Sequence, residues 1–249
     1  MTLLITEVHV NADLRDAAVL FLADRRITTK GRKSQYMHKI FQIPYLNAGV
    51  GFAGLAQVSA SQFFPDWLNN FIRHQSDVQS IQEFAQRLQA DLNQVVFKDY
   101  LRQNPSILHL CGANPDGYPE LWHLRNCTMR GNDYFDCRPV YDLSEDFMSR
   151  HAARGGHNGV PSQVARPFDV YYINGDVLPF HASWPFLDQF ADIMLSRADF
   201  KKLDTEQSLM TYAKWKMKVI TTFYSAFAKE PIIGGPSDVF VLRPKQIPR

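Results

Sequence analysis

Two apolar segments open the chain and predict two neighbouring β-strands. Thr2 to Val10 is rich in β-branched and apolar residues, and Ala17 to Ala23 is almost continuously apolar. The polar stretch Asn11 to Asp16 between them predicts a turn. Because the second segment is apolar at nearly every position, it predicts a strand that is covered on both faces, as in the middle of a layered fold.

A second pair of strands and two helices are predicted next. The apolar segments Lys39 to Ile43 and Leu46 to Phe52 are separated by Pro44. Apolar residues then recur at steps of three and four, which predicts helices from Gly54 to about His74 and from about Ser80 to Leu101.

The remaining half of the chain repeats this order of strands and helices. The predicted strands are Ile107–Gly112, Glu120–Leu124, Phe168–Ile173 and Asp238–Leu242, and the predicted helices lie near Trp184–Leu195 and about Thr205–Phe227. Strands that alternate with paired helices indicate sheets stacked in the middle with helices outside. We interpret residues 1–249 as one domain. The stretch from about 130 to 167 has no periodicity, which predicts an insertion that is a candidate for interface or function.

The composition is that of an ordinary soluble protein. Of the 249 residues, 45% are hydrophobic and 21% are charged, and the formal net charge is +2. No long basic run supports a nucleic-acid partner, and no apolar run approaches the roughly 18 residues that cross a bilayer. No signal peptide is visible, and three cysteines are too few for a disulfide framework. We therefore expect a cytoplasmic protein that is not bound to a membrane.

Three further features have ordinary structural interpretations. His151 and His157 lie six residues apart in a predicted loop, which is not a convincing metal spacing, and we expect no metal or cofactor. Cys111 lies in a predicted strand, where a buried small apolar residue is the simplest role. The stretch Lys214 to Lys218 predicts a helix with one solvated basic side, although an acidic partner is an alternative.

Four blocks of the sequence stand in an order that is similar to a known family. They are VLFLADRRIT (19–28), KIFQI (39–43), AGVGFAGLAQ (48–57) and PIIGGPSDVFVL (231–242). Together they resemble proteasome β-subunits, which are N-terminal-nucleophile (Ntn) hydrolases, over about 1–125 and 168–249. The resemblance implies an α+β fold, the four-layer αββα sandwich of the Ntn-hydrolase and proteasome type.

The resemblance also implies a set of catalytic residues. Thr2 falls on the nucleophile of the family, which removal of Met1 would expose. Asp24 falls on the structural acid, Lys39 on the catalytic lysine and Gly51 on the oxyanion glycine. In the late catalytic turn, Glu230 falls on the acid of the family.

These residue types suit amide hydrolysis. An α-amine can activate the hydroxyl of the residue that carries it, and its ordinary pKa of about 7.7–8 suits a general base. The ammonium of Lys39 would lower that pKa further, and Asp24 could hold Lys39 in place. The N–H of Gly51 could stabilise the oxyanion, a contribution of roughly 3–4 kcal/mol in other enzymes. A retained Met1 would abolish this mechanism.

The chain departs from the family at two supporting positions. Ile233 falls where the family has a serine, and Asp176 falls loosely on another serine. The resemblance further implies a substrate pocket that is lined by Ile27, Gly49 and Ala53. The small size of the last two predicts a roomy pocket for large apolar side chains.

The sequence therefore predicts a threonine peptidase that hydrolyses polypeptides. The resemblance implies a homo-oligomeric double ring, and the chain is nearer to divergent bacterial homologues, such as the β-proteobacterial one, than to HslV. The sequence does not specify an ATPase partner. Two alternatives stay open, an Ntn amidase or acylase that acts on a small amide and a catalytically inactive ring subunit.

Overall fold

The structure is a computed structural model that describes residues 2–10, 17–27, 35–113, 119–130, 133–144, 168–176, 178–200 and 202–243. The predicted α+β class is confirmed, because both helices and antiparallel sheets make up these residues. Within these ranges, no helix combines the length and the apolar character that crossing a membrane requires.

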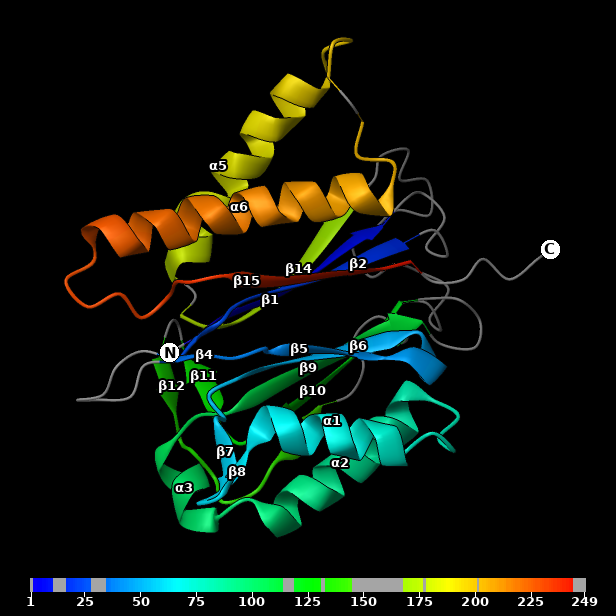
Figure 1. The fold of residues 1–249 in the computed structure, drawn as a ribbon, viewed down its shortest axis with the longest axis vertical. Coiled ribbons are helices and arrows are strands. Elements are labelled where there is room, and N and C mark those ends of the chain that lie inside the picture. Colours follow the sequence, from blue (N-terminus) through cyan, green and yellow to red (C-terminus); the bar gives the residue numbers. More distant parts are fainter. Residues whose placement is uncertain are drawn as a thin grey trace.

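A four-stranded antiparallel sheet forms one half of the molecule. Its strands, in spatial order, are β14 (Phe168–Gly175), β1 (Leu3–Val10), β2 (Ala17–Asp24) and β15 (Ser237–Leu242). Two helices cover its outer face, α5 (Leu178–Leu195) and α6 (Glu206–Phe227) (Figure 1).

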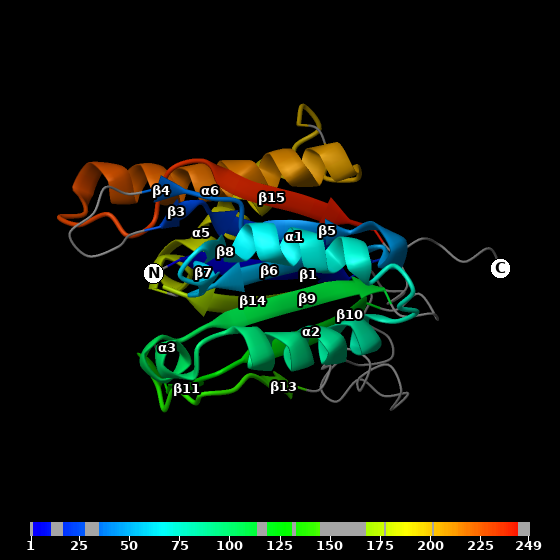
Figure 2. The ribbon, with the colours of Figure 1, turned by 60° about the horizontal axis from the view of Figure 1, so that its bottom comes forward.

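A five-stranded antiparallel sheet lies against the inner face of the first. Its strands, in spatial order, are β13 (Asp142–Ser144), β10 (Pro119–Arg125), β9 (Ile107–Ala113), β6 (Ala48–Ala53) and β5 (Ile40–Ile43). The outer face of this sheet carries α1 (Phe64–His74) and α2 (Ile81–Val95) (Figures 1 and 2).

Short elements complete the described chain. They are β3 (Arg26–Ile27), β4 (Gln35–Tyr36), the 3₁₀ helix η1 (Pro44–Leu46), β7 (Gln57–Ser59), β8 (Gln62–Phe63), α3 (Lys98–Gln103), β11 (Thr128–Arg130) and β12 (Asp133–Phe135).

Strand β2 is covered on both faces, as its continuous apolar sequence predicts. Leu20 and Leu22 pack with the buried residues of α5 and α6. Val19 and Phe21 point to the other side, where they pack with Cys111 of the second sheet. Side chains alternate between the faces of a strand, so a strand between two apolar layers must be apolar throughout. Cys111 is fully buried in this layer, which confirms its expected structural role.

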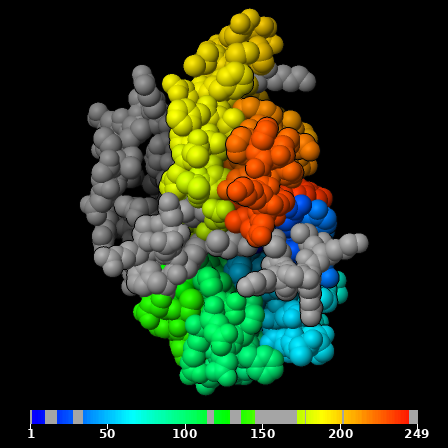
Figure 3. Space-filling view, turned by 90° about the vertical axis from the view of Figure 1, so that its left-hand side faces the viewer, coloured from blue at the N-terminus to red at the C-terminus, as the bar shows by residue number. Residues whose placement is uncertain are grey.

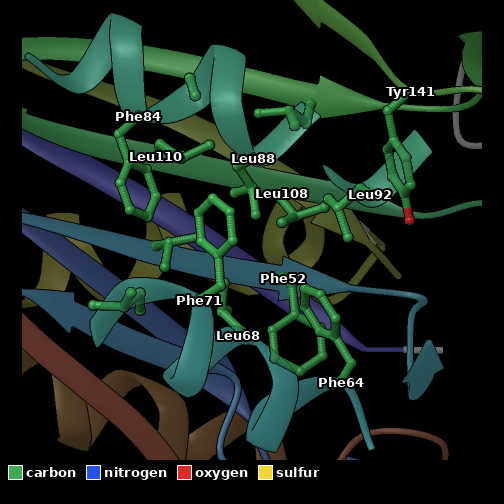
Figure 4. Close-up of a cluster of buried hydrophobic side chains, with 14 of the residues drawn as sticks. Phe52, Phe64, Leu68, Phe71, Phe84, Leu88, Leu92, Leu108, Leu110 and Tyr141 are labelled. Atoms are coloured by element: carbon green, nitrogen blue, oxygen red, sulfur yellow. The ribbon is translucent and has the colours of Figure 1, made fainter. Parts of the chain in front are cut away.

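The second sheet shares a large aromatic and aliphatic core with α1 and α2. Figure 4 shows Phe84 and Leu88 of α2 pointing toward Leu108 and Leu110 of β9. The rings of Phe52 and Phe64 meet edge to face, with centroids 4.6 Å apart, a favourable arrangement of two aromatic rings. These contacts fix the position of β6, and β6 leads directly to the candidate site.

The first predicted helix was too long. Residues 57–63 form the hairpin of β7 and β8, and α1 begins only at Phe64. Pro65 lies in the first turn of α1, where its missing N–H removes no helical hydrogen bond. Val58 is buried in the same core whether it lies on a helix or a strand, so its apolar character did not distinguish the two.

The second predicted helix is divided in two. Ser80 accepts a hydrogen bond from the N–H of Glu83 and begins α2, as expected for an N-cap residue. The helix ends at Val95, because Val96 is extended, with φ −85° and ψ 132°, and α3 follows from Lys98. Three consecutive residues without strong helix propensity, Val95, Val96 and Phe97, lie at this break.

The described part of the predicted insertion contains regular structure. β11 and β12 form a hairpin, and β13 adds an edge strand beside β10. Residues 145–167, which include His151 and His157, lie outside the described residues, as does the predicted turn at 11–16.

The prediction of a solvated basic side on α6 is wrong for Lys216. This side chain is fully buried, with its Nζ 3.0 Å from Oε1 of Glu7 and 2.8 Å from Oδ1 of Asp188. It also lies 4.2 Å from the ring centroid of Trp184, within the range of a cation–π interaction. Lys214 and Lys218 are exposed as expected.

Candidate active site

Thr2 and Lys39 are in direct contact at one end of the two sheets. Thr2 immediately precedes β1, and Lys39 immediately precedes β5 of the second sheet. The Nζ of Lys39 donates to Oγ1 of Thr2 at 2.5 Å and to the carbonyl oxygen of Arg26 at 2.7 Å. Both side chains are almost completely buried. The structure therefore joins these two predicted residues across the inter-sheet space.

Asp24 lies behind this pair, at the end of β2. Its Oδ1 is 3.6 Å from Nζ of Lys39 and accepts a hydrogen bond from the N–H of Leu3 at 2.9 Å. Its Oδ2 accepts from the N–H of Arg26 at 3.1 Å and of Gly234 at 3.3 Å. Three backbone donors and an ammonium therefore satisfy a carboxylate that is fully buried.

Burial is the largest influence on the ionisation of this pair. It lowers the pKa of Lys39 to about 8, against the opposing attraction of Asp24 and Asp238. Burial also raises the pKa of Asp24, against the opposing effects of Lys39 and the three backbone donors. A lysine whose pKa is lowered by burial beside a hydroxyl is an arrangement common at functional sites.

A cavity of about 460 Å³ opens at Thr2 and Lys39. Its other walls are Arg26, Ile27, Met37, Phe52, Gly54, Leu55, Ala56, Gln57, Tyr100, Asn104 and Pro105. The lining combines apolar side chains with two cations, and no carboxylate is among the described residues that line it. This volume is within the range of small-molecule and peptide side-chain sites.

Of the predicted pocket residues, only Ile27 lines this cavity. Gly49 faces β2 instead, since a Cβ placed on it would lie 2.9 Å from the ring of Phe21. Ala53 is buried in the inter-sheet space with Leu4 and Ala23. The small size of these residues therefore allows the two sheets to approach and does not enlarge the cavity.

The structure also places Gly51 inside the sheet and away from the cavity. It pairs with Ile40 on one side and with His109 on the other, and a Cβ there would meet Leu4 at 2.8 Å. The next residue, Phe52, donates its N–H to the carbonyl oxygen of Lys39. Because backbone groups alternate along a strand, the N–H of Gly51 is directed toward β9.

Of the residues expected to support the site, one lies beside Thr2 and two lie away from the cavity. Glu230 is solvent-exposed between α6 and β15 and does not line the cavity. Ile233, which falls where the family has a serine, is fully buried and packs in the core beneath α5 and α6. Asp176 does lie beside Thr2, because its N–H donates to the carbonyl oxygen of Thr2 at 2.8 Å.

The cavity is also lined by two residues whose role the sequence did not indicate. Gly54 and Leu55 line it just beyond the end of β6, and their N–H groups make no hydrogen bond within the described residues. The hydroxyl of Tyr100 donates to the carbonyl oxygen of Gly54 at 3.0 Å and holds this turn. Gly54 has a positive φ of 88°, so a glycine directly after the apolar strand Ala48–Ala53 was the sequence signal that could have indicated a special backbone position.

Comparison with known proteins gives no assignment. None of the protein-family models matches the chain, and no curated protein is significantly similar to it.

Proposed function

We propose that this protein is a threonine peptidase of the Ntn-hydrolase type, in which Thr2 attacks the peptide bond after removal of Met1. The observation that carries the proposal is the 2.5 Å contact between Nζ of Lys39 and Oγ1 of Thr2 at the cavity. Two sheets stacked between pairs of helices, with Thr2 at the start of β1, support the αββα sandwich of that class.

The proposed reaction uses the hydroxyl and the α-amine of Thr2. Oγ1 attacks the carbonyl carbon of the peptide bond while the amine takes the hydroxyl proton. The tetrahedral intermediate then collapses, and the amine gives that proton to the leaving nitrogen as the C–N bond breaks. Water hydrolyses the resulting ester by the same route and restores Thr2. Lys39 favours the neutral amine by like-charge repulsion, and Asp24 keeps Lys39 oriented.

The oxyanion requires donors other than the one implied by the resemblance. The N–H of Gly51 is directed toward β9, whereas Gly54 and Leu55 line the cavity with N–H groups that have no partner within the described residues. We assign these two amides to the developing negative charge. A single fixed donor to an oxyanion contributes roughly 3–4 kcal/mol to transition-state stabilisation in other hydrolases.

Self-association into a ring-type homo-oligomer is part of the same proposal, with α5 and α6 as one contact surface. Large apolar side chains stand exposed at helical spacing on both helices: Phe186, Phe190, Ile193, Trp215, Val219, Phe223 and Phe227. Figure 3 shows α5 (yellow) and the carboxyl end of α6 (orange) side by side at this end of the molecule. Their exposed area is on the order of the 800 Å² that one partner contributes to a stable interface.

The experiment compares two electrophilic probes by intact mass. A β-lactone acylates a nucleophilic hydroxyl, whereas an epoxyketone reacts with both the hydroxyl and the free amine of an N-terminal threonine. We expect loss of Met1 and one adduct from each probe, both absent from Thr2→Ala. Lys39→Met should reduce labelling strongly, because it removes the cation beside the nucleophile while it preserves the side-chain volume.

The outcomes separate the alternatives. A chain that retains Met1 and reacts with neither probe would refute the peptidase and favour an inactive subunit. Labelling at Thr2 with no cleavage of unfolded polypeptides, but with hydrolysis of small amides, would instead favour an amidase.

The cavity walls predict that peptides with apolar residues at the cleavage position are better substrates than those with Lys or Arg, because Arg26 and Lys39 repel a third cation.

A further inference from the structure

Asp238, the aspartate of the segment PIIGGPSDVFVL (231–242), connects the two sheets next to the site. Asp238 lies in β15 and is only 6% exposed. Its Oδ2 accepts a hydrogen bond from the N–H of Lys39 at 2.6 Å. Its Oδ1 accepts from Nε of Arg25 at 2.6 Å and lies 3.0 Å from Nδ1 of His38. One buried carboxylate thus binds the backbone at Lys39 from the opposite sheet.

Two carboxylates on neighbouring strands hold the two ends of Lys39. In the register of β2 with β15, Asp24 lies opposite Ser237 and Ala23 lies opposite Asp238. Asp24 faces the ammonium, whereas Asp238 binds the main chain of the same residue. Because the Lys39 side chain is almost completely buried, it has little room to change rotamer, and the position of its Nζ relative to Thr2 follows the position of its backbone.

The geometry points to Asp238 as a positioning residue, which sets the distance from Lys39 to Thr2 by holding the Lys39 backbone. This inference rests on the proposed function. Arg25, at the end of β2, and His38 complete the surroundings of the carboxylate, and the His38 side chain is 62% exposed. Because His38 does not contact Thr2 or Nζ of Lys39, it offers a matched control on the same carboxylate.

The test measures the rate of β-lactone labelling and of peptide hydrolysis as a function of pH. Asp238→Ala should lower kcat by about 100-fold with KM nearly unchanged, because a displacement of about 1 Å can have that effect on a reacting group. Asp238→Asn keeps an acceptor for the N–H of Lys39 and should recover part of this loss. Its missing charge should also move the alkaline limb of the profile to lower pH, since Asp238 raises the pKa of Lys39.

His38→Ala should stay within about twofold of the wild-type rate, because the bond from Lys39 to Asp238 remains. Circular dichroism and urea unfolding establish that each variant is folded; if Asp238→Ala is not, Asp238→Asn and its pH profile decide. Wild-type labelling rates and an unchanged alkaline limb in Asp238→Asn would overturn the inference, as would an equal loss in His38→Ala. An inactive wild-type protein would instead overturn the proposed function.

Discussion

Replacing Lys216 by methionine should destabilise the protein more than any other single change of a charged residue on α6. The substitution leaves Glu7 fully buried, and among the described residues His9 is then the remaining ion-pair partner, which is charged only when it is protonated. Breaking a buried ion pair by removing one partner typically costs about 3–5 kcal/mol. The substitution also removes the cation–π contact between the Lys216 ammonium and the ring of Trp184, which adds a smaller loss of stability. For a chain of this length the expected fall in Tm is roughly 6–20 °C.

The loss should depend on pH. Burial raises the pKa of Glu7, but its hydrogen bond with His9 and the charge of Lys216 outweigh this and lower the pKa below its ordinary value. A lowered pKa means that the carboxylate stabilises the wild-type protein above pH of about 4.3, and this stability is lost as the pH falls further. Without Lys216, burial dominates and Glu7 takes up a proton at higher pH. The difference between wild type and variant should therefore shrink from pH 7 toward pH 5.

Urea unfolding, followed by tryptophan fluorescence at a fixed protein concentration, measures both effects. The double variant Glu7→Gln with Lys216→Met is the matched control, because it removes the charge that the single variant leaves unpaired. We expect it to be more stable than Lys216→Met alone. A loss below about 1 kcal/mol, the range of an exposed ion pair, would refute this reasoning. So would a difference that is the same at pH 7 and pH 5.

Two further predictions concern the cavity and the outer helices. Gly54→Ala should lower the free energy of unfolding by about 1–3 kcal/mol from the positive φ alone, and more from contact with the carbonyl oxygen of Pro105, 1.9 Å from the new Cβ. Urea unfolding measures this loss, and an unchanged midpoint would contradict it. Replacing Phe223 and Phe227 together by serine should shift the protein to smaller species in sedimentation velocity without a loss of helix in circular dichroism, because both side chains are more than half exposed. An unaltered distribution of species would exclude this part of α6 from the contact.

The strands at the start of the chain were predictable because their apolar patterns have one structural solution. Ala17 to Ala23 must lie between two apolar layers, and the structure places it there. The region around Val58 was not predictable in the same way. The spacing of its apolar residues fits a helix, and a hairpin that leads into a helix buries them equally well.

The candidate site was predictable only in part. The resemblance brought Thr2, Asp24 and Lys39 together, and these three are in contact or nearly so. The cavity walls at Tyr100 and Asn104 come from α3 and the residue that follows it, which carry no recognisable motif. An ion pair between residues far apart in the sequence explains why the burial of Lys216 was not predicted. Lys216 looked like a surface residue, because its main partner, Glu7, lies 209 positions away in the sequence.

The hydrogen bonds of Asp24 have a consequence for when the site can form. This carboxylate binds the N–H of Leu3 and also the N–H of Gly234, which lies 210 positions after Asp24 in the sequence. During synthesis, Thr2 and Lys39 emerge from the ribosome long before the segment that completes their support. A partly made chain therefore contains Thr2 and Lys39 but lacks part of the framework that orients them. Under the proposed function, hydrolytic activity would therefore arise only after Gly234 has been made, which would protect neighbouring nascent proteins from cleavage.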